Sequence, residues 1–346
     1  MRGWRGFFLI ITFICPLWSG QEIIKDSLQR TILLPAKATR ILSVQPEITR
    51  IIVALGGGER LVGVDYFIRS NDHLIPVAFP RILKLPPVSV TPEDMNFETV
   101  MRLNPDVIFA SPTEAKMVDN LQKKLNKPVA ALASMGSLAK LQEEILIVGR
   151  ILGLEARAKS IVSYIRDRLQ AVAASVPRLA VEKKPRVYLA FWGLLTRTPV
   201  LYEPVNVAGG INCAENLLLA SLGTIGAHIN IEQILKWDPD VILVHGNYPP
   251  RERLISVAGI LGDPRLASVE AVRRKNVFYT FGYWYWWDPA QVLIETLYLA
   301  RILYPDSSAP FELEMEGNAV YKEIYGVGDG FTSLSRILNC HEWFQK

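Results

Sequence analysis

Two segments of the chain carry nearly the same order of polar and apolar residues, NFETVMRLNPDVI at 96–108 and NIEQILKWDPDVI at 230–242. Each opens with Asn and has Glu two positions later, which suits the N-cap and the first turn of a helix. Apolar residues follow at helical spacing, Pro-Asp ends the helix, and a β-branched run predicts a buried strand. A helix–turn–strand unit that occurs twice predicts two similar lobes.

The first half of the chain alternates short apolar runs with helical stretches. Strands are expected at 40–44, 61–64, 107–110 and 129–132, with helices at 49–55 and 115–125. A glycine run, 56–58, ends the first of these helices. Strands that alternate with helices in this way predict a parallel sheet covered by helices.

A long helical stretch separates the two halves. Residues 137–175 read as helical with one break at Gly153, and the part from 155 to 175 has apolar residues at helical spacing. At about 1.5 Å per residue this part is a rod of roughly 30 Å, long enough to bridge two domains. Pro177 and the charged residues 182–184 mark the boundary that follows.

The second half repeats the alternation. Strands are expected at 186–191, 241–245 and 276–279, and helices at 214–220, 262–274 and 288–303. The fold class predicted is α/β, with two similar lobes of mainly parallel, helix-covered sheet joined by a single long α-helix and a ligand cleft between them. The expected division is an N-terminal lobe at 21–136, a helical segment at 137–177 and a C-terminal lobe at 178–346.

The first twenty residues are predicted to be a signal peptide. Arg2 and Arg5 precede an apolar run from Phe7 to Leu17, which is too short to span a bilayer as an unaided helix. A lipid anchor at Cys15 fits its Ile14 and Pro16 neighbours poorly, and an uncleaved membrane anchor is the other alternative. In each case the rest of the chain is expected to be periplasmic or otherwise extracytoplasmic.

Charge and cysteine content exclude some classes of protein. Without Arg2 and Arg5 the chain has 36 basic and 34 acidic side chains, a balance that gives no electrostatic case for nucleic acid. The exported part has only Cys213 and Cys340, which is not a disulfide scaffold, and whether the two pair stays open. Ser43 and Ser111 lack a His or Asp arrangement typical of a nucleophile, so catalysis has little support.

The chain resembles the helix-linked substrate-binding proteins of ABC importers that serve vitamin B12, ferric siderophores and related metal chelates. The resemblance covers about residues 40–338 and rests on the order of several motifs: the two Glu-containing repeats, GGIN at 209–212, DPRL at 263–266, NVFY at 276–279 and YKEIYG at 321–326. It implies a ligand-binding monomer with no intrinsic cofactor, whose partners are an ABC permease and its ATPase subunits.

The resemblance also implies a docking role for one carboxylate on each lobe, which arginines of the permease meet. Glu98 and Glu232 stand at the matching places. Both residues also suit the first turn of a helix, where the helix dipole favours a carboxylate. A purely helix-stabilising role therefore remains the alternative.

The ligand is expected beyond the carboxyl ends of the strands, where open α/β sheets bind their ligands. The predicted ligand-binding residues are Tyr66, Arg69, Trp192, Arg197, His245, Tyr248, Tyr283, Trp284, Tyr285 and Trp286, with Gln45, Glu114, Asn247 and Arg251 as further candidates. The arginines suit an anionic chelate, since guanidinium groups match carboxylate and catecholate oxygens.

The segment 281–287, FGYWYWW, has six aromatic residues in seven positions and no counterpart in the first half. A loop offers no continuous apolar face to bury them, so they are expected to supply rigid surface for a flat or chelated ligand. A loop packed beneath the C-terminal helix is the alternative.

The four histidines, His73, His228, His245 and His341, show no paired ligand spacing, so a bare metal site is not predicted. His245 is the one expected to reach a metal held within a chelate. A ferric siderophore is the first choice of ligand, and cobalamin, haem and a nickel chelate remain open. A periplasmic chelatase-like enzyme is the alternative from a different class.

Overall fold

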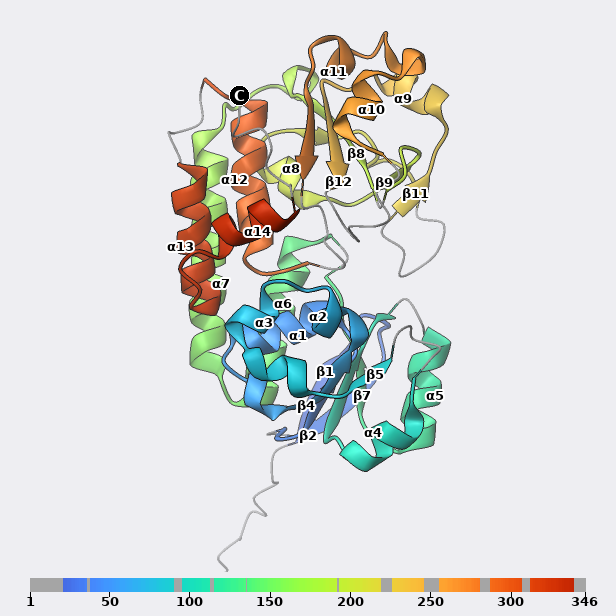
Figure 1. The fold of residues 1–346 in the computed structure, drawn as a ribbon, viewed down its shortest axis with the longest axis vertical. Helices are drawn as coiled ribbons and strands as arrows, with labels where there is room; N and C mark the ends of the chain where they lie inside the picture. Colours follow the sequence, from blue (N-terminus) through green and yellow to red (C-terminus); the bar gives the residue numbers. More distant parts are fainter. Residues whose placement is uncertain are drawn as a thin grey trace, which may run out of the picture.

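The computed structural model describes residues 21–35, 38–89, 95–112, 115–134, 136–191, 193–218, 226–245, 255–280, 287–306 and 312–338. Figure 1 shows two lobes stacked along the longest axis, with helices running past both of them on one side. The predicted two-lobed α/β fold is confirmed. The predicted signal peptide lies outside the described residues.

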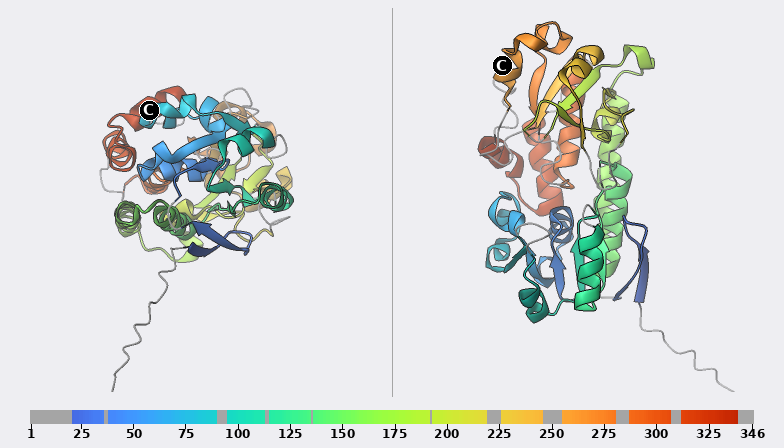
Figure 2. Two further views of the ribbon diagram at one scale, coloured as in Figure 1. Left: turned by 90° about the horizontal axis from the view of Figure 1, so that it is seen from below. Right: turned by 90° about the vertical axis from the view of Figure 1, so that its right-hand side faces the viewer.

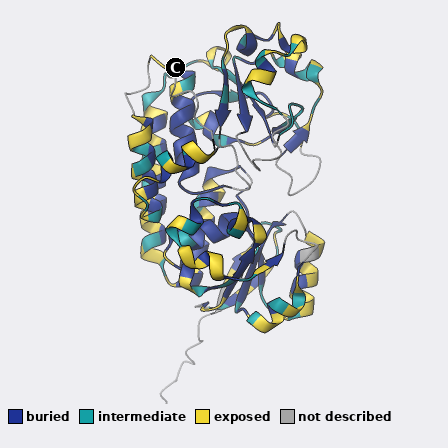
Figure 3. Cartoon of the chain, viewed as in Figure 1, coloured by how far each residue is buried: buried dark blue, intermediate teal, exposed yellow. Residues whose placement is uncertain are grey.

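The N-terminal lobe is built on a five-stranded parallel sheet of order β5-β4-β3-β6-β7. Its strands are β3 (Ile41–Ser43), β4 (Leu61–Asp65), β5 (Pro87–Ser89), β6 (Val107–Ala110) and β7 (Val129–Ala131). Its helices are α1 (Pro46–Ala54), α2 (Tyr66–Ser70), α3 (Ile75–Ala78), α4 (Phe97–Leu103) and α5 (Ala115–Leu125), with 3-10 turns at Gly58–Arg60 and Pro80–Lys84. Strands β3, β6 and β7 are buried throughout, as a sheet with two covered faces requires (Figure 3).

The C-terminal lobe has a smaller parallel sheet of order β10-β8-β12-β13. Its strands are β8 (Arg186–Ala190), β10 (Ile211–Asn212), β12 (Val241–His245) and β13 (Val277–Thr280), and β9 (Arg197–Pro199) pairs antiparallel with β11 (Gly226–His228) beside it. The short helices of this lobe are α8 (Glu203–Val207), α9 (Ile231–Trp237), α10 (Val257–Leu261) and α11 (Glu270–Arg273), with 3-10 turns at Val181–Lys183 and Pro264–Leu266.

The repeated sequence unit folds the same way in both lobes. Asn96 and Asn230 cap α4 and α9 by accepting the N–H of Thr99 and Gln233, each at 2.9 Å. Each helix ends on a left-handed residue, Asn104 or Asp238, before the Pro-Asp pair. The following strands, β6 and β12, are buried along their whole length, which confirms the predicted unit.

The Pro-Asp pair of each repeat also fixes the first strand of its sheet. The carboxylate of Asp106 accepts the N–H of Thr39 at 2.8 Å and that of Arg40 at 2.9 Å, just before β3. The carboxylate of Asp240 accepts the N–H of Arg186, the first residue of β8, at 2.8 Å. The recurring Asp is therefore a hydrogen-bonding partner of the sheet and not only a helix stop.

Two antiparallel helices, α6 (Leu138–Leu152) and α7 (Glu155–Ser175), follow the N-terminal sheet, and α7 runs alongside both lobes (Figure 2). Gly149 of α6 lies so close to α7 that a Cβ atom there would be 2.4 Å from the Cβ of Ala158. The break at Gly153 is a left-handed C-cap with φ of 62°. The helix 155–175 matches the sequence prediction in both bounds.

Three C-terminal helices complete the layer that joins the lobes: α12 (Gln291–Leu303), α13 (Leu313–Tyr325) and α14 (Gly330–Leu338). Helix α12 contacts α7, and α13 contacts α1 of the N-terminal lobe. One core cluster includes apolar side chains of α1, α6, α7, α12 and α13. The two lobes are therefore joined by α7 and also by this shared helical core, which the sequence pattern did not predict.

Several features differ from the predicted elements. The helix expected at 262–274 consists of the 3-10 turn Pro264–Leu266 and the short helix α11. Residues 213–216 form turns, residue 217 forms a bend and residue 218 is irregular, where the start of a helix at 214–220 was expected. That prediction is wrong for the described part, because Asn212 caps the turn by accepting the N–H of Ala214 at 3.0 Å. An unpredicted hairpin, β1 (Gln21–Lys25) and β2 (Thr31–Pro35), packs beside β7, where Ser27 donates its N–H to the carbonyl of Ala131 at 2.9 Å.

Candidate ligand site at the junction of the lobes

The carboxyl ends of the two sheets face each other at the junction of the lobes. Helix α1 begins three residues beyond the end of β3, and its Glu47 accepts the N–H of Trp287, seven residues beyond the end of β13, at 3.1 Å. The segment that follows β7 meets the C-terminal lobe as well, since Leu138 donates its N–H to Glu203 at 2.6 Å. A ligand of this fold is expected at this edge.

In the C-terminal lobe, two predicted residues gather on one aromatic ring. The imidazole of His245, at the end of β12, stacks on the ring of Phe191 with centroids 5.1 Å apart and an interplanar angle of 16°. The guanidinium carbon of Arg197, at the start of β9, lies 5.7 Å from the same ring centroid. His245 and Phe191 are buried and Arg197 is half-buried, and this burial lowers the pKa of Arg197. The structure thus holds a cation, an imidazole and an aromatic face in one cluster.

In the N-terminal lobe, Tyr66 and Arg69 lie on α2, directly after β4. Tyr66 is 44% exposed. Nη1 of Arg69 lies 3.5 Å from the carbonyl oxygen of Leu85. The N-cap of α2 is Asp65, whose carboxylate accepts the N–H of Ile68 at 3.0 Å. Burial raises the pKa of Asp65 to about 6, against the opposing effects of this hydrogen bond and the charge of Arg50.

Several predicted ligand residues lie outside the described part of the chain: Trp192, Tyr248, Tyr283, Trp284, Tyr285 and Trp286, together with Glu114, Asn247 and Arg251. Gln45 is described and is fully buried. Its amide accepts the N–H of Glu47 at 2.6 Å and donates to the carbonyl of Leu132 at 3.0 Å. Both ends of the Gln45 amide are therefore engaged in the N-cap of α1 and in its attachment to the segment after β7.

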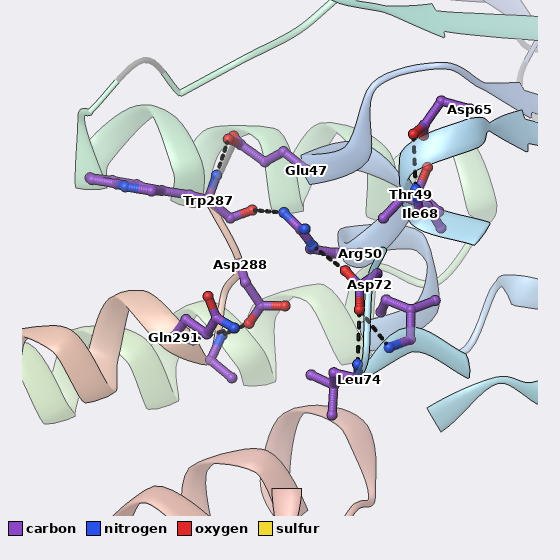
Figure 4. A network of polar contacts seen from close by, with 12 residues as sticks. Glu47, Thr49, Arg50, Asp65, Ile68, Asp72, Leu74, Trp287, Asp288 and Gln291 are labelled. Atoms are coloured by element: carbon purple, nitrogen blue, oxygen red, sulfur yellow. Dashed lines mark hydrogen bonds and ion pairs between the residues drawn. The ribbon is translucent and has the colours of Figure 1, made fainter. Parts of the chain in front are cut away.

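A buried polar network that the sequence analysis did not predict joins the lobes here (Figure 4). Arg50 of α1 forms a buried ion pair with Asp72 at 2.9 Å, and Asp72 also caps α3 by accepting the N–H groups of Leu74 and Ile75. Asp288 caps α12 and accepts the hydroxyl of Tyr325 at 2.6 Å. The only available sign was a set of charged residues within apolar helical segments, such as Glu47 and Arg50 in α1.

Metal-binding side chains do not cluster in the described ranges, where no group of three His, Cys, Asp or Glu residues could hold an ion. Cys213 is a buried free thiol whose pKa burial raises to about 12, and Cys340 lies outside the described residues. Within the same ranges, no helix is both long and apolar enough to cross a bilayer.

The two predicted docking residues are exposed on equivalent helices. Glu98 lies in the first turn of α4 and Glu232 in the first turn of α9. Three residues later, on the same helical face, stand Met101 and Leu235, which are 61% and 38% exposed. The repeat therefore presents a carboxylate beside an exposed apolar side chain on each lobe.

Comparison with known proteins agrees with this architecture. The sequence profile of the periplasmic binding proteins matches residues 41–282, well over half of the chain. The chain belongs to the periplasmic binding protein family. This binding protein is the substrate-binding component of an ABC importer and not an enzyme, which removes the chelatase-like alternative; it carries a transported ligand in place of an intrinsic cofactor.

Relatives of the binding protein have diverse ligands. The molybdate-binding protein MolA of Haemophilus influenzae is 23% identical over 339 residues, covering 88% of this chain and 91% of its own. A cobalamin-binding protein of Halobacterium salinarum is 26% identical over 222 residues, covering 63% of this chain and 57% of its own.

Solved structures show the same fold. MolA bound to molybdate has a TM-score of 0.72 at 22% identity, covering 88% of this chain and 98% of that one. A Ni–His complex of Helicobacter pylori CeuE has a TM-score of 0.71 at 18% identity, covering 92% and 99% of the two chains.

Proposed function

We propose that this binding protein captures an anionic, metal-containing ligand at the junction of its lobes and delivers it to an ABC permease. The observation that carries the ligand class is the cluster of Arg197 and His245 on the ring of Phe191. A half-buried guanidinium suits an anionic ligand, because charge-assisted hydrogen bonds to anionic oxygens are strong where solvent is partly excluded. The cluster lies at the carboxyl ends of β8 and β12, and open α/β sheets generally bind their ligands at this edge, which supports the proposal.

Two sources of such a ligand share one chemistry, namely oxygen atoms that carry negative charge around a metal. One is an anionic ferric siderophore, the ligand first expected from the sequence. The other is a metal oxyanion such as molybdate, the ligand named for the relative MolA. The imidazole of His245 can donate a hydrogen bond to either, or contact the metal of a chelate directly.

Isothermal titration calorimetry separates these sources. The protein is titrated with ferric catecholate and hydroxamate siderophores, molybdate, cyanocobalamin, haem and a nickel–histidine complex. We expect one anionic complex to bind at a stoichiometry of one. Tight binding of cobalamin alone, a ligand without anionic oxygens on its metal, would overturn the proposed ligand class.

The contribution of Arg197 is tested with the ligand that binds. Loss of a charge-assisted hydrogen bond is expected to weaken affinity by about 10- to 100-fold in Arg197→Ala. Arg178→Ala is the matched control, because Arg178 is exposed on the segment that enters β8, at the opposite end of that strand from the site. Equal affinities of the two variants would remove Arg197 from the site.

We further propose that α4 and α9 dock the permease through two equivalent patches, Glu98 with Met101 and Glu232 with Leu235. The carboxylates suit permease arginines, and the exposed apolar side chains beside them suit a partner that excludes water around those ion pairs. The patches occupy the same positions of the repeat in both lobes. A role in helix stability alone would explain the two Glu residues but not the exposed Met101 and Leu235.

Transport into proteoliposomes that contain the cognate permease and ATPase tests this docking surface. The double variant Glu98→Ala/Glu232→Ala is expected to abolish uptake with unchanged ligand affinity, and Met101→Ser/Leu235→Ser is expected to reduce it. Lys116→Ala/Lys123→Ala, on the neighbouring helix α5, is the control pair. Normal uptake by the Glu double variant would show that α4 and α9 are not the docking surface.

A further inference from the structure

Helix α1 of the N-terminal lobe contacts the backbone of Trp287, which lies shortly before helix α12. The N–H of Trp287 donates to Oε2 of Glu47 at 3.1 Å, and the carbonyl of Trp287 lies 3.5 Å from Nη1 of Arg50. Glu47 and Arg50 are three residues apart on α1 and therefore lie on the same helical face. The indole of Trp287 is buried and meets Tyr202 of the C-terminal lobe edge-on, with centroids 6.4 Å apart. The ring of Trp287 therefore packs on the C-terminal lobe, and its backbone contacts the N-terminal lobe.

The same carboxylate also holds the segment that follows β7. Oε1 of Glu47 accepts the N–H of Ser134 at 3.0 Å, so both oxygens of this buried side chain accept backbone donors. Glu47 therefore connects the segment after β7 with the residue that leads into α12.

A second buried carboxyl group lies against Glu47. Glu144 of α6 is buried, and its Oε2 has no hydrogen-bond partner within the described ranges. Burial, followed by the adjacent charge of Glu47, raises the pKa of Glu144 well above its usual range.

Other charged groups surround this pair from each element packed against it. A cavity of about 220 Å³ behind Glu144 is lined by Glu143 and Lys140 of α6 and by Lys25 and Asp26 of the hairpin. On the other side of Glu47, Arg50 is paired with Asp72 and lies near Asp288 and Tyr325. Asp26 is engaged by the N–H groups of Leu28 and Arg30 and by the Arg30 guanidinium.

We propose that Glu47 is a positioning residue for ligand binding, whose carboxylate fixes the Trp287 peptide and with it the relative setting of the two lobes. The contacts in question are those of Glu47 with Trp287 and Ser134. If they are lost, the junction becomes mobile and the ligand must bring it into place, which weakens binding. Only the effect on affinity rests on the proposed function; the effect on the lobes does not.

The substitution Glu47→Gln tests the contacts directly. A glutamine can accept only through its one carbonyl oxygen, so one of the two backbone donors loses its acceptor. Glu143→Gln is the matched control, because it makes the same chemical change at an exposed position of α6 that has no contact with the Trp287 peptide. Spin labels are attached to cysteines introduced at the exposed positions Lys123 of α5 and Lys236 of α9, and Cys15 and Cys340 are replaced by Ser. Pulsed electron–electron double resonance then reports the distance between the lobes without any ligand.

We expect a narrow distance distribution for the parent chain and for Glu143→Gln, and a broadened one for Glu47→Gln. Ligand affinity is expected to fall about 10-fold in Glu47→Gln and to stay unchanged in Glu143→Gln. An unbroadened distribution in Glu47→Gln, or equal broadening in both variants, would overturn the proposal. A chain that binds none of the ligands but shows these distributions would instead refute the proposed ligand class alone.

Discussion

Asp65 shows at the residue scale how a buried carboxyl group makes stability depend on pH. Its folded-state pKa is raised to about 6 by burial, so the folded state keeps a proton that the unfolded state releases near its ordinary pKa of 3.8. The stabilisation of the folded state is therefore fully present below about pH 4 and is lost as the pH rises to about 6. Oδ2 of Asp65 has no hydrogen-bond partner in the described chain, which is why ionisation is costly.

Asp65→Asn is expected to remove this loss while retaining the N-cap of α2, since Asn caps helices about as well as Asp. The unfolding free energy of the variant, relative to that of the parent chain, should rise by on the order of 2–3 kcal/mol from about pH 4 to pH 7. Urea unfolding at both pH values measures it. A difference between the two proteins that does not change with pH would contradict the prediction.

The buried ion pair of Arg50 and Asp72 differs in energetic consequence from the exposed pair of Arg81 and Glu59. Side chains of the first pair are 2% and 3% exposed, and those of the second are 48% and 70% exposed. Asp72→Ala leaves a buried guanidinium without this partner and should cost about 3–5 kcal/mol of unfolding free energy. Glu59→Ala should cost less than about 1 kcal/mol. Similar costs in urea unfolding would show that burial does not set the energy of these pairs.

At the scale of elements, the sequence predicted well those features whose cause is local. The Asn caps, the apolar spacing and the Pro-Asp stops of 96–108 and 230–242 act within a few residues, so α4, β6, α9 and β12 appear where expected. The helix expected at 214–220 is not formed in its described part, because Asn212 stabilises a turn in competition with the apolar helical pattern. The β1–β2 hairpin was missed because its partner, β7, lies about a hundred residues away.

The contact of α6 with α7 depends on a missing side chain. Gly149→Ala would place a methyl group against Ala158, and we expect it to lower the unfolding free energy by about 1–3 kcal/mol despite the better helix propensity of alanine. Adding Ala158→Gly to this variant should restore part of the loss. Thermal unfolding of the two single variants and the double variant measures this coupling. Strictly additive effects would contradict a direct contact between the two positions.

At the scale of the whole molecule, the sequence predicted the lobes and their connecting helix but not what fixes them together. The contact of Glu47 with Trp287 spans 240 positions and involves the backbone of Trp287. A pattern of apolar side chains contains no information about such a backbone contact. For the same reason Arg197 and His245 were predicted only as separate residues, and Phe191, whose ring both of them contact, was not predicted as a site residue. The assembly of this cluster depends on the register of β8, β9 and β12.

The helical layer of α7, α12 and α13 predicts that the lobes close only slightly on a ligand. Because α12 packs on α7 and α13 packs on α1, large rotation would expose buried apolar surface. Small-angle X-ray scattering with and without a bound ligand should give nearly equal radii of gyration. A strong contraction on binding would contradict this expectation.

The central claim is that this periplasmic binding protein takes one anionic, metal-containing ligand, held in part by Arg197. Native mass spectrometry of the protein, incubated with an equimolar mixture of ferric siderophores, molybdate, cobalamin, haem and nickel–histidine, tests it in competition. The account predicts a single 1:1 adduct whose mass matches an anionic metal complex and which Arg197→Ala strongly reduces. An adduct with cobalamin alone, or one equally abundant in Arg197→Ala, would contradict it.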